Sequence, residues 1–580
     1  MLKKLNHVFF GLSLLLCLTA HSVIAGEKTE KVSKRQLPSS IKVQPWGASQ
    51  AEIDAAKTRV ERSMEVQSFL KGTKYRLISF NFLENETKGS AAQPPTRFRV
   101  VFYDYTNDRT IVAENDLTAK DALKVREEFY QPVPNDEEFE EAASLLNKDA
   151  RFTASLASKN LKSFRPMPPT TVLDGTNERL INVGLIADSM SNEVVSVSLK
   201  TGKVIRYDSG APETAKAAPE ACGNPDSGQG ATTGGLAGQY QVTIQQNQTT
   251  LWEMLVIRPS ASTGTLASGV EIRDVKYKGK SVLKRGHVPV LNVEYVANAC
   301  GPYRDWQYAE GFFNAPEENS VNPAPGIRVL APGKVATTVI ETGNDTGNFQ
   351  GVAIYQQNVG FGNETVMVSE VNAGWYRYIM EWRFADDGTI RPRFGFGGIN
   401  NACVCNVHNH HAYWRLDFDV VNPANKVFQV ERGRRFMQPI TTEINRNKNI
   451  STRRSLMIQN ATGDEAYMLV PNLSDGVVDA FGRNDFWVLR YKNVPNGSEL
   501  QNEFNDGYTG IGGACTPTSG SCINITKFVD GESVVNQDVV VWYGAHFIHN
   551  DGSNLLDPNR SGQVLTGTHV VGPDIRPVRW

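Results

Sequence analysis

The sequence predicts an α+β protein: two small helix-on-antiparallel-sheet domains followed by a large antiparallel β-sandwich. Three observations predict this class. Two early stretches each show a helical run followed by alternating, strand-like runs. A stretch rich in Gly, Ala, Pro, Ser and Thr at 209–238 has no periodicity, which is typical of a linker. Beyond it, short β-rich runs alternate with Asn-Gly, Asp-Gly and Pro-Gly turns up to Trp580.

Residues 1–25 have the pattern of a secretory signal peptide. Lys3 and Lys4 precede an apolar core at 8–18, and small-residue cleavage is expected after Ala25. The apolar core is too short to span a bilayer. We therefore expect an exported protein, periplasmic or secreted.

Composition favours a soluble globular protein without a strongly charged partner. The net charge is -2, with 40% hydrophobic and 21% charged residues. Such a balance gives no indication of binding to nucleic acid or to a membrane surface.

Cysteine usage agrees with export. One cysteine, Cys17, lies in the leader and leaves a lipoprotein as the alternative. After removal of the signal peptide an even number of cysteines remains, which favours disulfides in an oxidising compartment. Cys515 and Cys522 bracket a turn-rich loop that a bridge would close. The others are Cys222, Cys300, Cys403 and Cys405.

The first small domain is expected at 26–115. Residues 27–50 are polar and contain proline, which indicates a loose lead-in. A helical pattern covers 51–70, and strand-like alternation follows at 75–83 and 97–105.

The second small domain, expected at 116–208, repeats this order. A helical pattern at 135–161 precedes strand-like runs at 179–186, 193–198 and 204–207. Neither small domain contains a clustered chemical motif, so we interpret both as accessory domains.

The β-sandwich, expected at 239–580, contains the stretch with the clearest chemistry. Residues 406–419 alternate as a strand and hold three histidines. Side chains two apart on a strand share a face, so His408 and His410 point together and His411 points away. Cys403 and Cys405 fall on the parity of His411, which argues against a mixed Cys/His metal site unless a bulge intervenes.

Three motifs in this region stand at recognisable spacings. His408-x-His410 is followed, after four residues, by Arg-Leu-Asp at 415–417. An Asp538-x3-Trp-Tyr strand precedes His549 by six residues. The third is the segment Gly-Trp-Tyr-Arg-Tyr-Ile at 374–379.

Together these motifs resemble the copper amine oxidases, and the resemblance covers most of the mature chain. It implies copper ligands at His408, His410 and His549, with His546 as a rival third ligand. Three neutral imidazoles suit Cu(II), Zn(II) or Ni(II), and Cu(II) is bound most tightly of these. The resemblance also implies that Tyr376 is the precursor of the topaquinone (TPQ) cofactor.

A further match implies the remaining catalytic residues. Tyr303 matches the tyrosine that holds the quinone oxygen, Tyr308 the gate tyrosine and Glu310 the catalytic base. The family oxidises a primary amine with dioxygen to an aldehyde, ammonia and hydrogen peroxide, and it is homodimeric. The sandwich would then be the catalytic domain.

This chain departs from the family at the cofactor tyrosine. Trp375 stands where the family has Asn, Arg377 stands where it has an acid, and Glu310 replaces Asp. The alternatives are therefore a catalytically silent copper-binding relative in which Tyr376 is not converted, and a zinc hydrolase that uses the same histidines. The sequence leaves the amine open.

A second ion, calcium or another hard cation, is predicted near the end of the strand that holds His408 and His410. Asp417 and Asp419 share a strand face, and Asp538 begins the strand leading to His549. Oxygen ligands suit Ca²⁺ or another hard cation. The resemblance adds the backbone carbonyls of Phe418 and Val539.

Overall fold

The computed structural model describes residues 40–580 except for several gaps. These gaps are 84–92, 120, 129, 133, 155–160, 165–169, 174, 188–191, 207–222, 225–234, 263–268, 296–302, 305–308, 361, 400–403, 405–407, 434, 479–483, 493–524 and 550–567. All seven cysteines lie outside the described residues. The predicted disulfides and leader therefore stay predictions.

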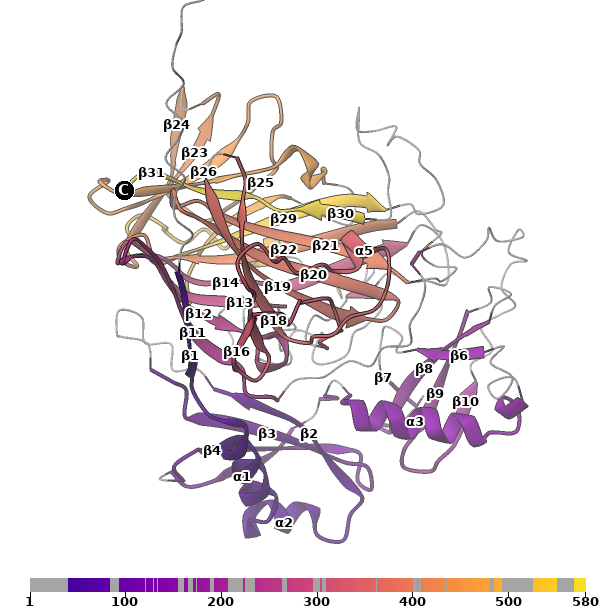
Figure 1. Ribbon diagram of the computed structural model, residues 1–580. Helices are drawn as coiled ribbons and strands as arrows, with labels where there is room; N and C mark the ends of the chain where they lie inside the picture. Colours follow the sequence, from indigo (N-terminus) through magenta and orange to yellow (C-terminus); the bar gives the residue numbers. More distant parts are fainter. Residues whose placement is uncertain are drawn as a thin grey trace, which may run out of the picture. The chain divides into compact units, whose positions relative to one another are not determined.

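The described chain is mostly β-sheet, and two large sheets dominate it (Figure 1). The first runs in the order β1-β11-β12-β13-β14-β22-β29-β28-β25, with β15 beside β14. Its strands are β1 (Ser40–Trp46), β11 (Gln239–Gln246), β12 (Thr249–Ile257), β13 (Glu271–Tyr277), β14 (Lys280–Tyr295), β15 (Tyr303–Arg304), β22 (His408–Phe418), β25 (Ile444–Arg446), β28 (Phe486–Arg490) and β29 (Val539–His549).

The second large sheet runs in the order β16-β17-β18-β19-β20-β21-β31-β27-β26-β23-β24, with β30 beside β21. Its strands are β16 (Val321–Ala324), β17 (Ile327–Val329), β18 (Val352–Asn358), β19 (Asn363–Ala373), β20 (Tyr376–Ala385), β21 (Ile390–Gly398), β23 (Asn425–Glu431), β24 (Phe436–Ile440), β26 (Ser455–Asn460), β27 (Ala466–Val470), β30 (Thr568–Val571) and β31 (Asp574–Arg579). Of its strand pairs, β17 with β18 is parallel.

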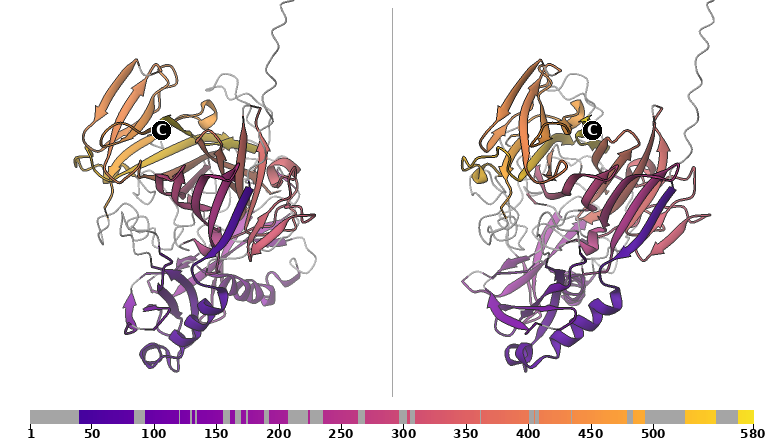
Figure 2. Two further views of the ribbon diagram at one scale, coloured as in Figure 1. Left: turned by 60° about the vertical axis from the view of Figure 1, so that its left-hand side comes forward. Right: turned by 90° about the vertical axis from the view of Figure 1, so that its left-hand side faces the viewer.

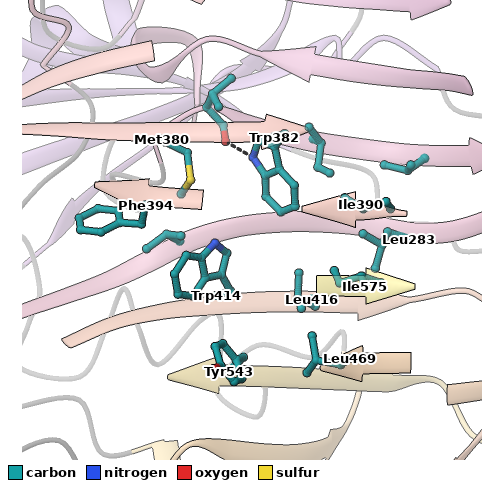
Figure 3. Packing of buried hydrophobic residues seen from close by; sticks show 14 of the residues in the cluster. Leu283, Met380, Trp382, Ile390, Phe394, Trp414, Leu416, Leu469, Tyr543 and Ile575 are labelled. Atoms are coloured by element: carbon teal, nitrogen blue, oxygen red, sulfur yellow. Dashed lines mark hydrogen bonds between the residues drawn. The ribbon is translucent and has the colours of Figure 1, made fainter. Parts of the chain in front are cut away.

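The two large sheets pack face to face through one hydrophobic core, as a β-sandwich (Figures 1 and 2). Trp414 of β22 and Trp382 of β20 are fully buried in it (Figure 3). The Trp382 indole donates a hydrogen bond of 2.9 Å to the carbonyl of Val270, directly before β13. This bond links the second sheet to the first. The predicted large β-sandwich is confirmed, and its named strands pair antiparallel except for β17 with β18.

The first small sheet has the order β2-β3-β4-β5. Its strands are β2 (Tyr75–Phe82), β3 (Arg97–Asp104), β4 (Arg109–Asp116) and β5 (Lys124–Glu128), preceded by α1 (Gln50–Glu61) and α2 (Met64–Leu70). The single expected helix is thus two helices. The break has a local cause, because Ser63 accepts a hydrogen bond from the Val66 backbone and so caps a new helix.

The second small sheet has the order β10-β9-β8-β6, with β7 beside β8. Its elements are α3 (Asp136–Lys148), β6 (Leu161–Phe164), β7 (Thr170–Val172), β8 (Arg179–Ala187), β9 (Asn192–Ser198) and β10 (Val204–Arg206). Val101 of β3 shares a buried cluster with Leu146 of α3 and Val183 of β8. Because Pro38–Trp580 form one compact unit, the domain boundaries stay predictions.

One element differs from expectation. Residues 40–46, expected within a loose lead-in, form β1 and pair along their whole length with β11 of the sandwich. Short exposed strands at a sheet edge carry little hydrophobic periodicity, so the sequence gives no local signal for this pairing.

Candidate metal and cofactor site

The three predicted copper ligands lie together between the sheets. His408 and His410 stand on β22, and His549 ends the neighbouring strand β29 directly opposite His408. All three side chains are fully buried. Each offers a nitrogen within 4.8 Å of the others, and Nδ1 of His549 lies 2.8 Å from Nε2 of His408.

Strand alternation places these rings on the core face. His408 and His410 share the parity of Trp414 and Leu416, which belong to the sandwich core. The His410 ring packs against Phe396, at 4.2 Å between centroids, and against Phe547, at 5.5 Å, and these two rings lie 5.5 Å from each other. The apolar walls therefore hold the imidazole in one orientation and exclude water.

The two other histidines of these strands face the opposite way. His411 and His546 are register partners, and their Nδ1 atoms lie 3.0 Å apart. Nε2 of His546 lies 2.8 Å from the Asn484 carbonyl. His546 is three residues from His549, so strand parity alone separates it from the cluster. The geometry favours His549 over His546 as the third ligand.

Tyr376 reaches the cluster from the other sheet. It is the first residue of β20 and follows a two-residue turn made by Gly374 and Trp375. Gly374 has φ of 59°, the left-handed conformation that this class of hairpin turn needs at its first central residue. The Tyr376 hydroxyl lies 2.6 Å from Nε2 of His408, and its ring centroid lies 5.0 Å from that of His410.

The donor chemistry fits copper. Three imidazoles form the cluster, and none of the described residues around it adds a thiolate. Such a set suits Cu(II), and a phenol oxygen beside it is within reach of a metal held there. A metal held by the three imidazoles would thus lie next to the Tyr376 ring.

Glu310 lies on the same side of the second sheet as Tyr376. It pairs with Val371, which in turn pairs with Tyr378 on the other side of β19. Directly opposite residues of antiparallel strands point to the same face, so Glu310 faces the sandwich interior. The predicted base thus lies on the same face of the sheet as the Tyr376 ring.

The Glu310 carboxylate is strongly engaged there. Arg258 forms a bidentate ion pair with it, and the Ser260 hydroxyl and backbone N–H donate hydrogen bonds of 2.7 and 3.1 Å. A Cβ at Gly238 or Gly326 would overlap the Arg258 side chain, so two glycines make room for it. A general base needs a carboxylate oxygen open to the substrate, and here Arg258 and Ser260 already occupy both oxygens. Sequence reasoning missed Arg258, which has no local signal.

Of the two other predicted site tyrosines, the structure describes Tyr303 in part and Tyr308 not at all. The backbone of Tyr303 pairs with Val293 of β14, which pairs with His410 on its other side. Tyr308 lies outside the described residues. Their roles stay predictions.

The predicted second-ion residues also gather. Asp417, Asp419 and Asp538 each offer a carboxylate oxygen within 4.8 Å of the others. Phe418 and Val539, whose carbonyls the resemblance adds, are register partners on β22 and β29. Asp417 and Asp419 are buried, which fits a cation more than a solvated acidic edge.

Another acidic group was not predicted. Glu443, Asp530 and Glu532 each offer a carboxylate oxygen within 4.8 Å of the others. Lys492 lies 2.7 Å from Asp530 and 3.0 Å from Glu532, so a lysine already balances part of this charge. Residues so far apart in sequence carry no motif that would have revealed the group.

Comparison with solved structures identifies the fold as that of the copper amine oxidases. A copper-containing benzylamine oxidase from Hansenula polymorpha aligns with a TM-score of 0.58 and 14% identity, over 92% of this chain and 97% of that one. An amine oxidase from Aspergillus nidulans gives 0.56 and 13%, over 92% and 88%. A lysyl oxidase from Pichia pastoris gives 0.56 and 12%, over 94% and 91%.

Comparison of the sequence alone gives no such relative. No family model matches it, and no curated protein matches it. Among the described residues, no helix is long and apolar enough to cross a membrane.

Proposed function

We propose that this protein is a divergent copper- and topaquinone-dependent primary amine oxidase. The observation that carries the proposal is the Tyr376 hydroxyl, 2.6 Å from one of three clustered, buried histidines. The fold supports it, because the similar solved structures include copper-containing and other amine oxidases along nearly their full length.

His408, His410 and His549 would hold Cu(II), and Tyr376 would be converted. The conversion consumes two dioxygen molecules per tyrosine and releases one hydrogen peroxide, which balances the two oxygens gained and two hydrogens lost by the ring. When formed, the quinone supplies an electrophilic carbonyl for a primary amine. Overall, the amine, dioxygen and water give an aldehyde, ammonia and hydrogen peroxide.

The proposal extends to the small domains, the export and assembly of the chain, the second ion and the two other tyrosines. The two small helix-and-sheet regions would be accessory domains, and the chain would be exported and would pair as a homodimer. Asp417, Asp419 and Asp538 would hold a structural calcium. Tyr303 and Tyr308 would border the substrate, whose identity stays open.

The second candidate is a catalytically silent copper-binding relative, and one observation favours it. Glu310 is ion-paired to Arg258 and bonded to Ser260, whereas a general base needs a carboxylate free to take a proton. A zinc hydrolase ranks below both, because such a site keeps an open position for water and here Tyr376 lies against the ligand cluster.

Copper loading in air followed by phenylhydrazine tests the proposal. We expect a coloured adduct on Tyr376, located by mass spectrometry in the peptide 371–381 that a glutamate-specific protease releases. The matched variant Tyr376→Phe should bind copper and form no adduct. Copper-loaded wild-type protein whose Tyr376 keeps its original mass would rule out the oxidase and leave the silent relative.

A further inference from the structure

An ion pair stands directly behind the tyrosine that faces the histidine cluster. Arg377 follows Tyr376 on β20, so its side chain points to the opposite face of the sheet. Its Nε and one Nη each lie 2.9 Å from an oxygen of Asp345, which follows α5 (Val339–Thr342). Asp345 is fully buried and Arg377 is 6% exposed. Arg377 stands where the resemblance expects an acid, and Asp345 supplies the carboxylate.

The same guanidinium also holds the backbone of the hairpin turn. It donates to the carbonyl oxygens of Gly374, at 3.3 Å, and Tyr376, at 3.2 Å. The carbonyl between them, that of Trp375, accepts a hydrogen bond of 2.7 Å from the Ile399 N–H. Three successive carbonyls around the turn are therefore bonded to groups outside the turn.

The ion pair and these hydrogen bonds act where the backbone changes from turn to strand. Tyr376 pairs with Ala373 and Gly398, but it is the first residue of β20, where the strand meets the turn. The end of a strand opens more readily than its middle. A bidentate Arg–carboxylate pair adds geometric specificity as well as energy. Asp345 belongs to a separate segment, the loop after α5, so the ion pair anchors the turn to that loop.

We propose that Asp345 and Arg377 form a positioning pair that keeps the Tyr376 ring directed at the histidine cluster while it is converted. The inference rests on the proposed function for its consequence, the rate of conversion. Its structural part, a turn held from behind, is measurable whether or not conversion occurs. Neither residue touches the reacting ring, so neither is a catalytic residue.

The test compares variants that change the pair to different degrees. Arg377→Lys keeps the charge and loses the planar fork. The double variant Asp345→Leu with Arg377→Met removes both charges, which avoids leaving one charge buried alone. The matched control is Glu138→Leu with Arg179→Met, which removes another fully buried Arg–carboxylate pair far along the chain, between α3 and β8.

Three quantities are measured for each purified protein. They are copper bound per chain, the rate at which the 371–381 peptide gains the quinone mass after copper and air are added, and amide hydrogen exchange of the same region in the copper-free protein. We expect unchanged copper content in all variants. Conversion should be about ten- to a hundredfold slower in both pair variants, with faster exchange of the hairpin amides, and unchanged in the control.

The outcomes separate this inference from the proposed function. Wild-type protein that never converts Tyr376 overturns the oxidase proposal, and hydrogen exchange then still decides whether the pair holds the turn. Wild-type rates and wild-type hairpin exchange in both pair variants would overturn the inference. So would equal slowing in the control, because the effect would then be one of general stability.

Discussion

The phenol oxygen of Tyr376 lies 2.6 Å from Nε2 of His408, although the two residues stand on different sheets. Tyr376 begins β20 in the second large sheet, and His408 begins β22 in the first. Their contact spans the sandwich, so the site exists because the two sheets pack against each other. Substitutions that disturb the packing of the shared core would therefore change the distance between Tyr376 and His408, even though neither residue is replaced.

Copper binding should depend on which face of β22 a histidine occupies. His410→Ala should lose most bound copper, since two imidazoles hold a metal much more weakly than three. His411→Ala, one residue along the same strand, removes a ring from the opposite face and should keep copper near one per chain. Metal content after dialysis checks this pair, and equal loss in both variants would contradict the assignment.

Glu310 distinguishes an active oxidase from a silent relative. In the oxidase, Glu310→Gln should still convert Tyr376 but lose amine turnover by roughly 10²–10⁴-fold. It should also lower stability by about 3 kcal/mol, because the buried Arg258 is left without its counter-ion. Phenylhydrazine titration, peroxide production and thermal unfolding check these three effects.

The corresponding control changes both partners. Glu310→Gln with Arg258→Met removes both charges and should recover stability while turnover stays absent. Recovery of turnover in this double variant would remove Glu310 as the base.

Stability should fall as pH rises through the range in which Glu370 ionises. Burial raises the pKa of Glu370 from 4.5 to about 8, although the Val339 N–H and Arg377 act against it. The folded protein therefore holds this proton where the unfolded chain has released it, and ionisation favours unfolding. Glu370→Gln should unfold at the wild-type temperature at about pH 4, below the unfolded-state pKa, and at a higher temperature than the wild type at about pH 9.

The size of this effect is bounded by the shift in pKa, at roughly 5 kcal/mol. Thermal unfolding of both proteins across the pH range measures it. A constant difference between the two proteins at every pH would show that Glu370 does not titrate in this window.

Calcium should stabilise the folded protein by binding to the acidic group of Asp417, Asp419 and Asp538. A ligand that binds the folded state raises the unfolding temperature by mass action, so added Ca²⁺ should raise it in the wild type. Asp417→Asn with Asp419→Asn should abolish the response and retain copper. Glu443→Gln with Glu532→Gln, at the other acidic group, is the control that should keep the response.

Local sequence pattern determined much of this protein. Alternation along β22 put His408 and His410 on one face and His411 on the other, as the structure has it. Strand periodicity located β2, β3, β8, β9 and β10 within a few residues but did not reveal β4, β5, β6 or β7. The second helical pattern was expected to run to 161, whereas α3 ends at Lys148. The features that were located depend on neighbours two to four positions apart, which a sequence displays directly.

The tertiary structure decided the pairings over long distances. His549 stands opposite His408 because the register of β22 on β29 places it there, 141 positions along the chain. Arg258 reaches Glu310 across 52 positions, and Asp345 reaches Arg377 across 32. The strand β1 joins the sandwich in the same way. Such contacts are chosen by how whole sheets pack and which buried charges they must pair, and no local periodicity encodes that choice.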